Sequence, residues 1–155
     1  MENAFFGKSW FRAKKRVTEL WDKQEAKIAH EQRRPYVAVL EKSGQIFCYI
    51  EANSGYIGVG FLDSAVREFL SYQFQEVEPG RLFLTMATHR EFDGGTDRVK
   101  CGTTYYFKPD GCVSVEAEDF EANQLTTTKT TVDVSNNWED YPNFGDYQSL
   151  ARVER

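Results

Sequence analysis

The chain has 155 residues, of which 15% are aromatic and 28% charged, and its formal net charge is −5. This length and composition are ordinary for a single globular domain, so we expect one domain over residues 1–155. No run approaches the roughly 18 apolar residues of a transmembrane helix, and we see no secretory signal. We therefore expect a cytoplasmic protein without membrane contact.

Charge is unevenly distributed along the chain. Residues 1–34 hold nine Lys or Arg and five acids, whereas residues 110–155 hold three and ten, a net charge of −7 (3 − 10). Such a region repels nucleic-acid phosphates and attracts a basic protein, although a solvated acidic face is the commoner explanation. We expect no nucleic-acid partner.

Residues 8–31 are predicted to form one amphipathic helix. Apolar side chains recur at spacings of seven, four and seven: Trp10, Val17, Trp21 and Ile28. Lysines fill the other side, and Pro35 ends the segment because the residue before a proline is pushed out of the helical region. A helix packed on a sheet requires such a stripe.

Residues 36–134 are predicted to form a mainly antiparallel sheet, with an early turn at Ser43 and Gly44. In the strand over residues 56–61, Gly58 and Gly60 alternate with apolar residues. Glycines on one face allow a bulky group, such as an aromatic ring, to lie close.

Two interpretations of residues 63–70 remain open. Asp63 is able to cap a short helix, whereas the apolar alternation that continues through Leu70 favours a strand from Val66. We prefer the strand.

The first long hairpin turns at Glu78, Pro79 and Gly80. A three-residue loop there places Phe74 opposite Leu84 and Tyr72 opposite Met86, so that both apolar sets share one face. Proline is disfavoured at the position that it would then occupy.

The second hairpin turns at Pro109, Asp110 and Gly111, which match a type I turn followed by a left-handed glycine. This turn pairs Phe107 with Val113 and Tyr105 with Val115. It also places Cys101 near Asp119, so a disulfide between Cys101 and Cys112 is not expected.

The expected fold is α+β: an N-terminal helix packed on a mainly antiparallel, meander-type curled sheet of about seven or eight strands, approaching a half-barrel. Residues 135–155 are expected to be irregular, acidic and aromatic, because Pro142 and Gly145 interrupt regular structure.

Catalytic and metal-binding patterns are scarce. Cys48 with His89 is a conceivable nucleophile pair, but coincidence explains it better. Glu116 and Glu118 share a strand face, as glycoside hydrolase carboxylates can, yet they belong to a wider acidic region. No zinc spacing or phosphate loop occurs. We expect no enzyme, metal or cofactor.

The acidic C-terminal region suits a protein partner, because aromatic residues dominate binding hot spots and acids speed association with a basic target. The candidate partner-binding residues are Glu116, Glu118, Asp119, Trp138, Glu139, Asp140, Tyr141, Phe144, Asp146 and Tyr147. An equally weighted alternative is that this segment folds its aromatic side chains back over the sheet.

Several stretches carry a family resemblance: Ala-Thr-His-Arg-Glu-Phe-Asp-Gly at 87–94, Thr-Tyr-Tyr-Phe-Lys-Pro-Asp-Gly at 104–111, Asn-Trp-Glu-Asp-Tyr-Pro at 137–142 and Phe-Gly-Asp-Tyr at 144–147. Over about the last two-thirds of its length, the chain resembles bacterial immunity proteins of polymorphic toxin systems, of the contact-dependent or type VI effector kind. The resemblance implies a non-enzymatic inhibitor that binds a cognate secreted toxin domain, such as a basic nuclease.

A second hypothesis is a carrier in which a half-open barrel holds a small hydrophobic ligand. The residues expected near its mouth are Tyr56, Gly58, Gly60, Tyr105 and Phe107.

Overall fold

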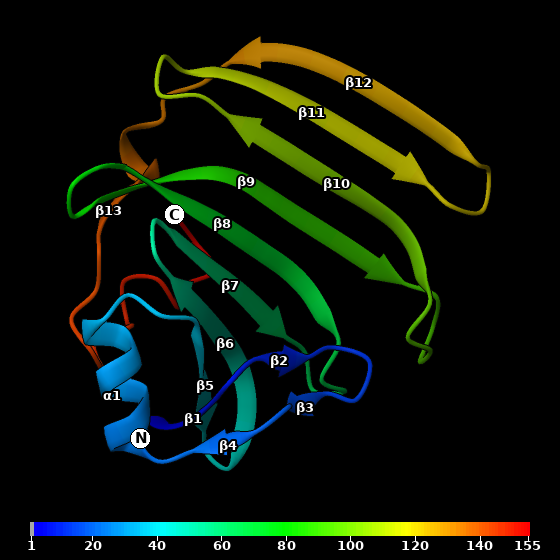
Figure 1. Cartoon of the computed structure of the whole chain (residues 1–155). Helices are drawn as coiled ribbons and strands as arrows, with labels where there is room; N and C mark the ends of the chain where they lie inside the picture. Colours follow the sequence, from blue (N-terminus) through cyan, green and yellow to red (C-terminus); the bar gives the residue numbers. More distant parts are fainter. Residues whose placement is uncertain (1) are drawn as a thin grey trace.

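A computed structural model describes residues 2–155, and its main element is an antiparallel sheet of eleven strands (Figure 1). These are β1 (Glu2–Gly7), β4 (Leu20–Trp21), β5 (Tyr36–Lys42), β6 (Gln45–Asn53), β7 (Tyr56–Leu62), β8 (Glu68–Glu78), β9 (Arg81–Phe92), β10 (Val99–Phe107), β11 (Cys112–Asp119), β12 (Gln124–Thr131) and β13 (Trp138–Asp140). The other elements are β2 (Trp10–Phe11) and β3 (Arg16–Val17), which form a separate small sheet, helix α1 (Lys23–Glu31) and the 3-10 turn η1 (Ser135–Asn137).

The strand order β12-β11-β10-β9-β8-β7-β6-β5-β1-β4 confirms the predicted antiparallel meander. Every pair from β5 to β12 joins neighbours in the sequence, and β1 adds to the free side of β5. The sheet is not strongly curled, so the predicted curl toward a half-barrel is not formed; β12 lies at one edge of the sheet and β4 at the other (Figure 1).

The predicted helix over residues 8–31 is wrong for residues 8–22, because helix α1 covers only Lys23–Glu31. Trp10 pairs with Val17 across the β2–β3 hairpin, and Trp21 pairs with Phe6 of β1. The apolar periodicity therefore came from residues of separate hairpins. β1 itself, over residues 2–7, was not predicted.

Helix α1 begins where the sequence provides a cap. Asp22 is extended, and its Oδ1 accepts a hydrogen bond from the Glu25 amide at 2.8 Å, which satisfies a free donor of the first turn. Ala26 and Ala29 are fully buried against the sheet, whereas Ile28, assigned to the predicted stripe, is 37% exposed.

The two faces of the sheet are covered differently. The helix face, represented by Ile50, Val59 and Phe74, packs beneath α1 and the C-terminal segment, residues 141–155. The hairpin face, on the other side, carries a smaller apolar cluster in which Val37 and Val39 pack with Trp10 from β2, and is largely polar beyond it.

The β8–β9 hairpin reaches part of the predicted register by a different route. Phe74 does pair with Leu84, but the loop has only two residues, Pro79 and Gly80, and one irregularity in the ladder, between Glu76 and Glu78, restores the pairing. Gly80 has a φ of 76°, so proline and glycine take the positions that a type II turn favours. A further irregularity makes Tyr72 pair with Ala87 rather than Met86.

The β10–β11 hairpin has the predicted register. Phe107 pairs with Val113, Tyr105 with Val115, and Cys101 with Asp119. None of the three cysteines, all of which lie in the described part of the chain, forms a disulfide.

The short helix after Asp63 is not formed. Asp63 Oδ1 instead accepts hydrogen bonds from the amides of Ala65 and Arg67, each at 2.9 Å, and Val66 has a φ of 58°. The strand interpretation holds from Glu68 onward. Residues 135–155, expected to be irregular throughout, begin with η1 and β13, and β13 pairs with β9.

Candidate functional site

The predicted C-terminal aromatic anchors are mostly packed into the protein. Tyr147 is 3% exposed, and its hydroxyl lies 3.0 Å from that of Tyr36. Phe144 stacks on Phe6 with 5.2 Å between ring centres. The segment thus folds back over the helix face, which was the open alternative to a binding surface.

Tyr141 and Trp138 are half-buried. The Tyr141 hydroxyl donates a hydrogen bond to the Asn53 carbonyl at 3.1 Å, and the Arg33 guanidinium lies 3.4 Å above its ring centre. Trp138 meets the edge of Phe83 at 4.9 Å. Both side chains therefore contribute to packing, although each keeps part of its surface in solvent.

The three predicted acids of residues 135–155, Glu139, Asp140 and Asp146, differ in environment. The Glu139 side chain is 9% exposed, and its Oε1 accepts from Arg155 and, at 3.1 Å, from Arg152. Asp140 and Asp146 are exposed at the surface. Glu139 therefore acts as an internal counter-ion, whereas the other two remain available to solvent.

Glu116, Glu118 and Asp119 lie on β11, far from those aromatic side chains along the sheet. Glu116 and Glu118 occupy the hairpin face, where the Tyr106 hydroxyl donates to Glu116 Oε2 at 3.3 Å. Asp119 accepts from the amides of Glu121 and Ala122 and so closes the turn before β12. The structure therefore separates the predicted acids into two groups.

We call β10, β11 and β12 the extension. Figure 1 shows these strands leaving the part of the sheet that α1 and β2–β3 cover. Half of the ten exposed large apolar side chains in the described residues lie on the extension or beside it: Tyr105, Tyr106, Phe120, Leu125 and Val132. Leu125 pairs with Glu118, so apolar and acidic groups share the hairpin face.

A charged cluster that the sequence analysis missed lies on the hairpin face nearer the core. Glu68, with a side chain 5% exposed, accepts at Oε2 from Arg12 at 2.6 Å and from Arg90 at 3.0 Å. Its Oε1 accepts from the Tyr49 hydroxyl. Burial, followed by the Glu68 charge, raises the pKa of Tyr49, so the phenol stays a hydrogen-bond donor.

The predicted role of the two glycines of β7 is confirmed. The Tyr49 ring lies where a Cβ of Gly60 would project, and Glu68 Oε1 lies 2.6 Å from that point. The Tyr56 hydroxyl is 2.8 Å from the equivalent point at Gly58. Glycine at these positions leaves room for the cluster around Glu68. The alternation of glycine with apolar residues in β7 was the only sign of this cluster in the sequence.

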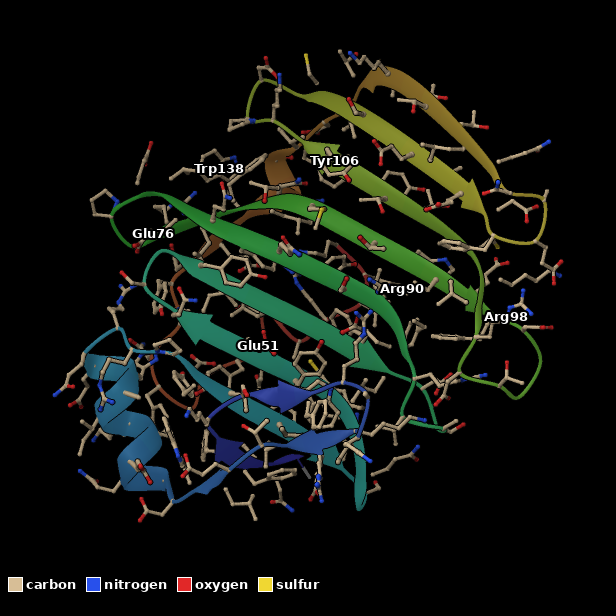
Figure 2. All side chains as sticks on the ribbon, turned by 45° about the vertical axis from the view of Figure 1, so that its right-hand side comes forward. Glu51, Glu76, Arg90, Arg98, Tyr106 and Trp138 are labelled. Carbon is tan, nitrogen blue, oxygen red and sulfur yellow. The ribbon has the colours of Figure 1, made fainter. Side chains whose placement is uncertain are left out.

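Glu51 lies beside this cluster on β6. Figure 2 places it on the same broad surface as Arg90 on β9 and Tyr106 on β10. Burial, followed by the charge of Glu68, raises the pKa of Glu51. The hairpin face thus combines the buried Glu68 with its two arginine partners, the half-buried Glu51 and the acidic strand β11.

The Cys48–His89 pair and the carrier mouth considered from sequence are not assembled. The ladder Cys48–Phe61–Leu70–His89 places Cys48 three strands from His89, roughly 14 Å apart at the usual strand spacing. Among residues 2–155, no group of three or more His, Cys, Asp or Glu is placed to hold a metal ion. No helix of this part of the chain is long and apolar enough to cross a membrane.

The five residues expected at a carrier mouth lie on opposite faces. Tyr56, Gly58 and Gly60 face the hairpin side, whereas Tyr105 and Phe107 face the helix side. They therefore do not surround one cavity.

No protein-family model, curated protein sequence or solved structure matches this chain. Its own geometry must therefore carry the functional argument. Two surfaces stand out: the extension, which is acidic and exposes apolar side chains, and the cluster around Glu68.

Proposed function

We propose that this protein is a non-enzymatic inhibitor that binds a partner protein through the extension, acting as an immunity protein against a cognate toxin domain in the bacterial cytoplasm. The observation that carries the proposal is the exposure of the extension. All eight residues of β12 are exposed, and Val113 is the one buried residue of β10 and β11.

Strands with so many exposed side chains gain little stabilising free energy from folding alone. Ordering each residue costs roughly 1–2 kcal/mol of backbone entropy, which burial normally offsets. Exposed apolar side chains among polar ones are typical of surfaces that another molecule covers. A partner that buries the extension would supply the missing contacts.

We assign the contact to the hairpin face of the extension. Tyr106, Phe120 and Leu125 are 41%, 47% and 62% exposed and can act as anchors. Glu116 and Glu118 lie between them and would steer a basic partner, such as a nuclease domain. Asp119 and Trp138 are left at the margin of this surface, Asp140 and Asp146 belong to the other acidic group, and the packed Tyr141, Phe144, Tyr147 and Glu139 support the fold.

The test begins with the gene immediately upstream, whose product would be a secreted protein with a small C-terminal domain. Production of that domain should arrest bacterial growth, and this protein should restore growth. Glu116→Gln with Glu118→Gln should slow association, because removal of steering charge acts mainly on the association rate.

Asp140→Asn with Asp146→Asn is the matched control, since it removes the same charge from the other acidic group. Equal association rates for the Glu116/Glu118 variant and the parent would move the binding surface away from the extension. Growth arrest that this protein does not relieve would exclude the immunity role.

A second candidate function is supported by a groove of about 520 Å³ on the helix face of the extension. Its apolar lining includes Phe107, Val113 and Val132, which suits a small hydrophobic ligand. Native mass spectrometry of protein purified from its own host would distinguish a carrier, which retains a small molecule, from an inhibitor, which retains a basic polypeptide.

A further inference from the structure

A cleft of about 660 Å³ opens on the hairpin face between three segments that are distant in sequence. One wall is the turn between β2 and β3, the second is the start of β8, and the third comes from β9 and the turn that follows it. Figure 2 shows Arg98 on that turn and Arg90 on β9. The volume lies within the range of small-molecule sites.

The side chains that line the cleft carry a net positive charge, whereas the whole chain is negative. It contains four cationic and two acidic side chains: Arg12, Lys15, Arg67, Arg90, Glu68 and Asp97. The difference is +2 (4 − 2), in a chain whose net charge is −5. An anion is therefore the ligand that this lining favours.

Two of the cations are held in place by the buried acid. Arg12 and Arg90 direct one terminal nitrogen each at the same oxygen of Glu68. A single carboxylate balances only one of the two guanidinium charges, and each guanidinium carries five N–H donors. Further donors of both arginines thus remain for a ligand, in side chains whose position is already set.

The other two cations differ in availability. Arg67 is committed to the turn, since it binds the Asp63 carboxylate and the carbonyls of Gly94 and Thr96. Lys15 donates to Asp97 at 3.1 Å and to the Ala65 carbonyl at 3.0 Å, which leaves one of its three donors, and its side chain is 30% exposed. The Arg12 side chain is 59% exposed. Arg12 and Lys15 are therefore the groups that an incoming anion meets.

The remaining lining is apolar. Phe92 lies beneath the Arg67 guanidinium at 4.7 Å, with Val66 and Val99 close by in the lining, and Phe11 is 42% exposed at the cleft. Burial of such surfaces is favourable for an apolar group that enters with the anion. A bare inorganic ion would leave them unused.

We propose that this cleft binds a small organic anion, a carboxylate or phosphate ester on an aromatic or aliphatic body, with Arg12 and Lys15 on the charged group and Phe11 on the body. The site uses residues other than the predicted anchors of the extension and does not depend on the proposed inhibitor function.

The test is a calorimetric titration of the whole protein with phenyl phosphate, phenylacetate, inorganic phosphate and phenol. Saturable one-to-one binding is expected for phenyl phosphate or phenylacetate, and the stronger of the two identifies the anion class. Phenol and inorganic phosphate should each bind at least about tenfold more weakly. Absence of binding by both aromatic anions up to about 10 mM would overturn the proposal.

Variants locate the site. Arg12→Gln should weaken the affinity for the aromatic anion by about tenfold or more, because a hydrogen bond to a charged group is lost. It should fold normally, since Arg90 continues to pair with Glu68. Phe11→Ala should weaken the affinity for the aromatic anion but leave the affinity for inorganic phosphate unchanged.

Arg34→Gln is the control, because Arg34 is an exposed arginine that does not line the cleft. It should keep the parent affinity within about twofold. Equal losses in Arg12→Gln and Arg34→Gln would show general charge attraction and overturn the assignment to this cleft. Lys15→Gln gives a second reading if Arg12→Gln proves unstable.

Discussion

The two ends of the meander have the same strand pairing but different surroundings. In β5, Val37, Ala38 and Val39 are fully buried, with cover on both faces of the sheet. In β12, all eight residues are exposed. Backbone hydrogen bonds to a neighbouring strand are therefore sufficient to form β12. The local free energy of unfolding, however, should be highest where both faces of the sheet are covered, as at β5.

The largest expected contrast is between side chains of these two regions. Phe74→Ala should lower the free energy of unfolding by about 3–5 kcal/mol, because it opens a cavity in a fully buried site. Leu125→Ala, on β12, should change it by less than about 0.5 kcal/mol. Urea denaturation measures both, and a cost at Leu125 that approached that at Phe74 would mean that the extension is covered in solution.

A second contrast separates neighbouring acids of β13. Glu139→Gln should destabilise the fold by about 2 kcal/mol, because the guanidinium of Arg155, 6% exposed, loses its charged partner. Asp140→Asn should have almost no effect, since that acid is exposed. Thermal melting of the two variants side by side checks this, and equal midpoints would contradict the internal role of Glu139.

A third contrast uses glycines on the hairpin face. Gly60→Ala should cost about 1–2 kcal/mol, because its methyl group would meet the Tyr49 ring and Glu68. Gly102→Ala, on β10, has a nearest atom at 3.5 Å and should stay within about 0.5 kcal/mol of the parent. Chemical denaturation provides the comparison, and a silent Gly60→Ala would imply that Tyr49 moves freely.

The smallest expected effect is a pH dependence from the covered region. Burial, followed by the charge of Arg33, lowers the pKa of His30, which lies 2.9 Å from the Tyr36 hydroxyl. The folded state therefore binds the proton less well than the unfolded state, whose pKa is 6.5. Stability should be fully present above that value and decline as the pH falls from 6.5 toward the lowered pKa, by at most about 1.4 kcal/mol per pH unit.

His30→Gln should flatten that part of the profile, with stability measured by urea denaturation between pH 7 and pH 5. The exposed His89 has no buried partner, so His89→Gln is the control. A parent profile that equals that of His30→Gln would show that another group causes the decline.

Local rules predicted the hairpins well. The turns at Gly44 and Gly111 have the left-handed backbone that their residues favour, and the pairing of Phe107 with Val113 follows from them. The helix over residues 8–31 failed because periodicity cannot tell one helix face from two hairpins whose apolar residues pack on different partners. Only the tertiary contacts of Trp10 and Trp21 decide between these structures.

The candidate sites were predicted only in part. Glu116 and Glu118 lie on one strand face as expected, because a period of two determines this. The cluster around Glu68 was missed, since Arg12 and Arg90 are 56 and 22 residues away in the sequence. An irregularity in the ladder pairs Leu62 with Glu68 and helps to direct the Glu68 carboxylate to the hairpin face. No local sequence pattern predicts this irregularity.

The extension also starts and finishes on the same strand. β9 pairs with β10 along Met86–Phe92 and with β13 along Arg81–Phe83, so the chain leaves β9 and returns to it. The hairpin of β11 and β12 is therefore an insertion between β10 and β13, which both pair with β9. Such an insertion can lengthen, shorten or change its surface while the rest of the sheet is retained, and the proposed binding surface lies on this insertion.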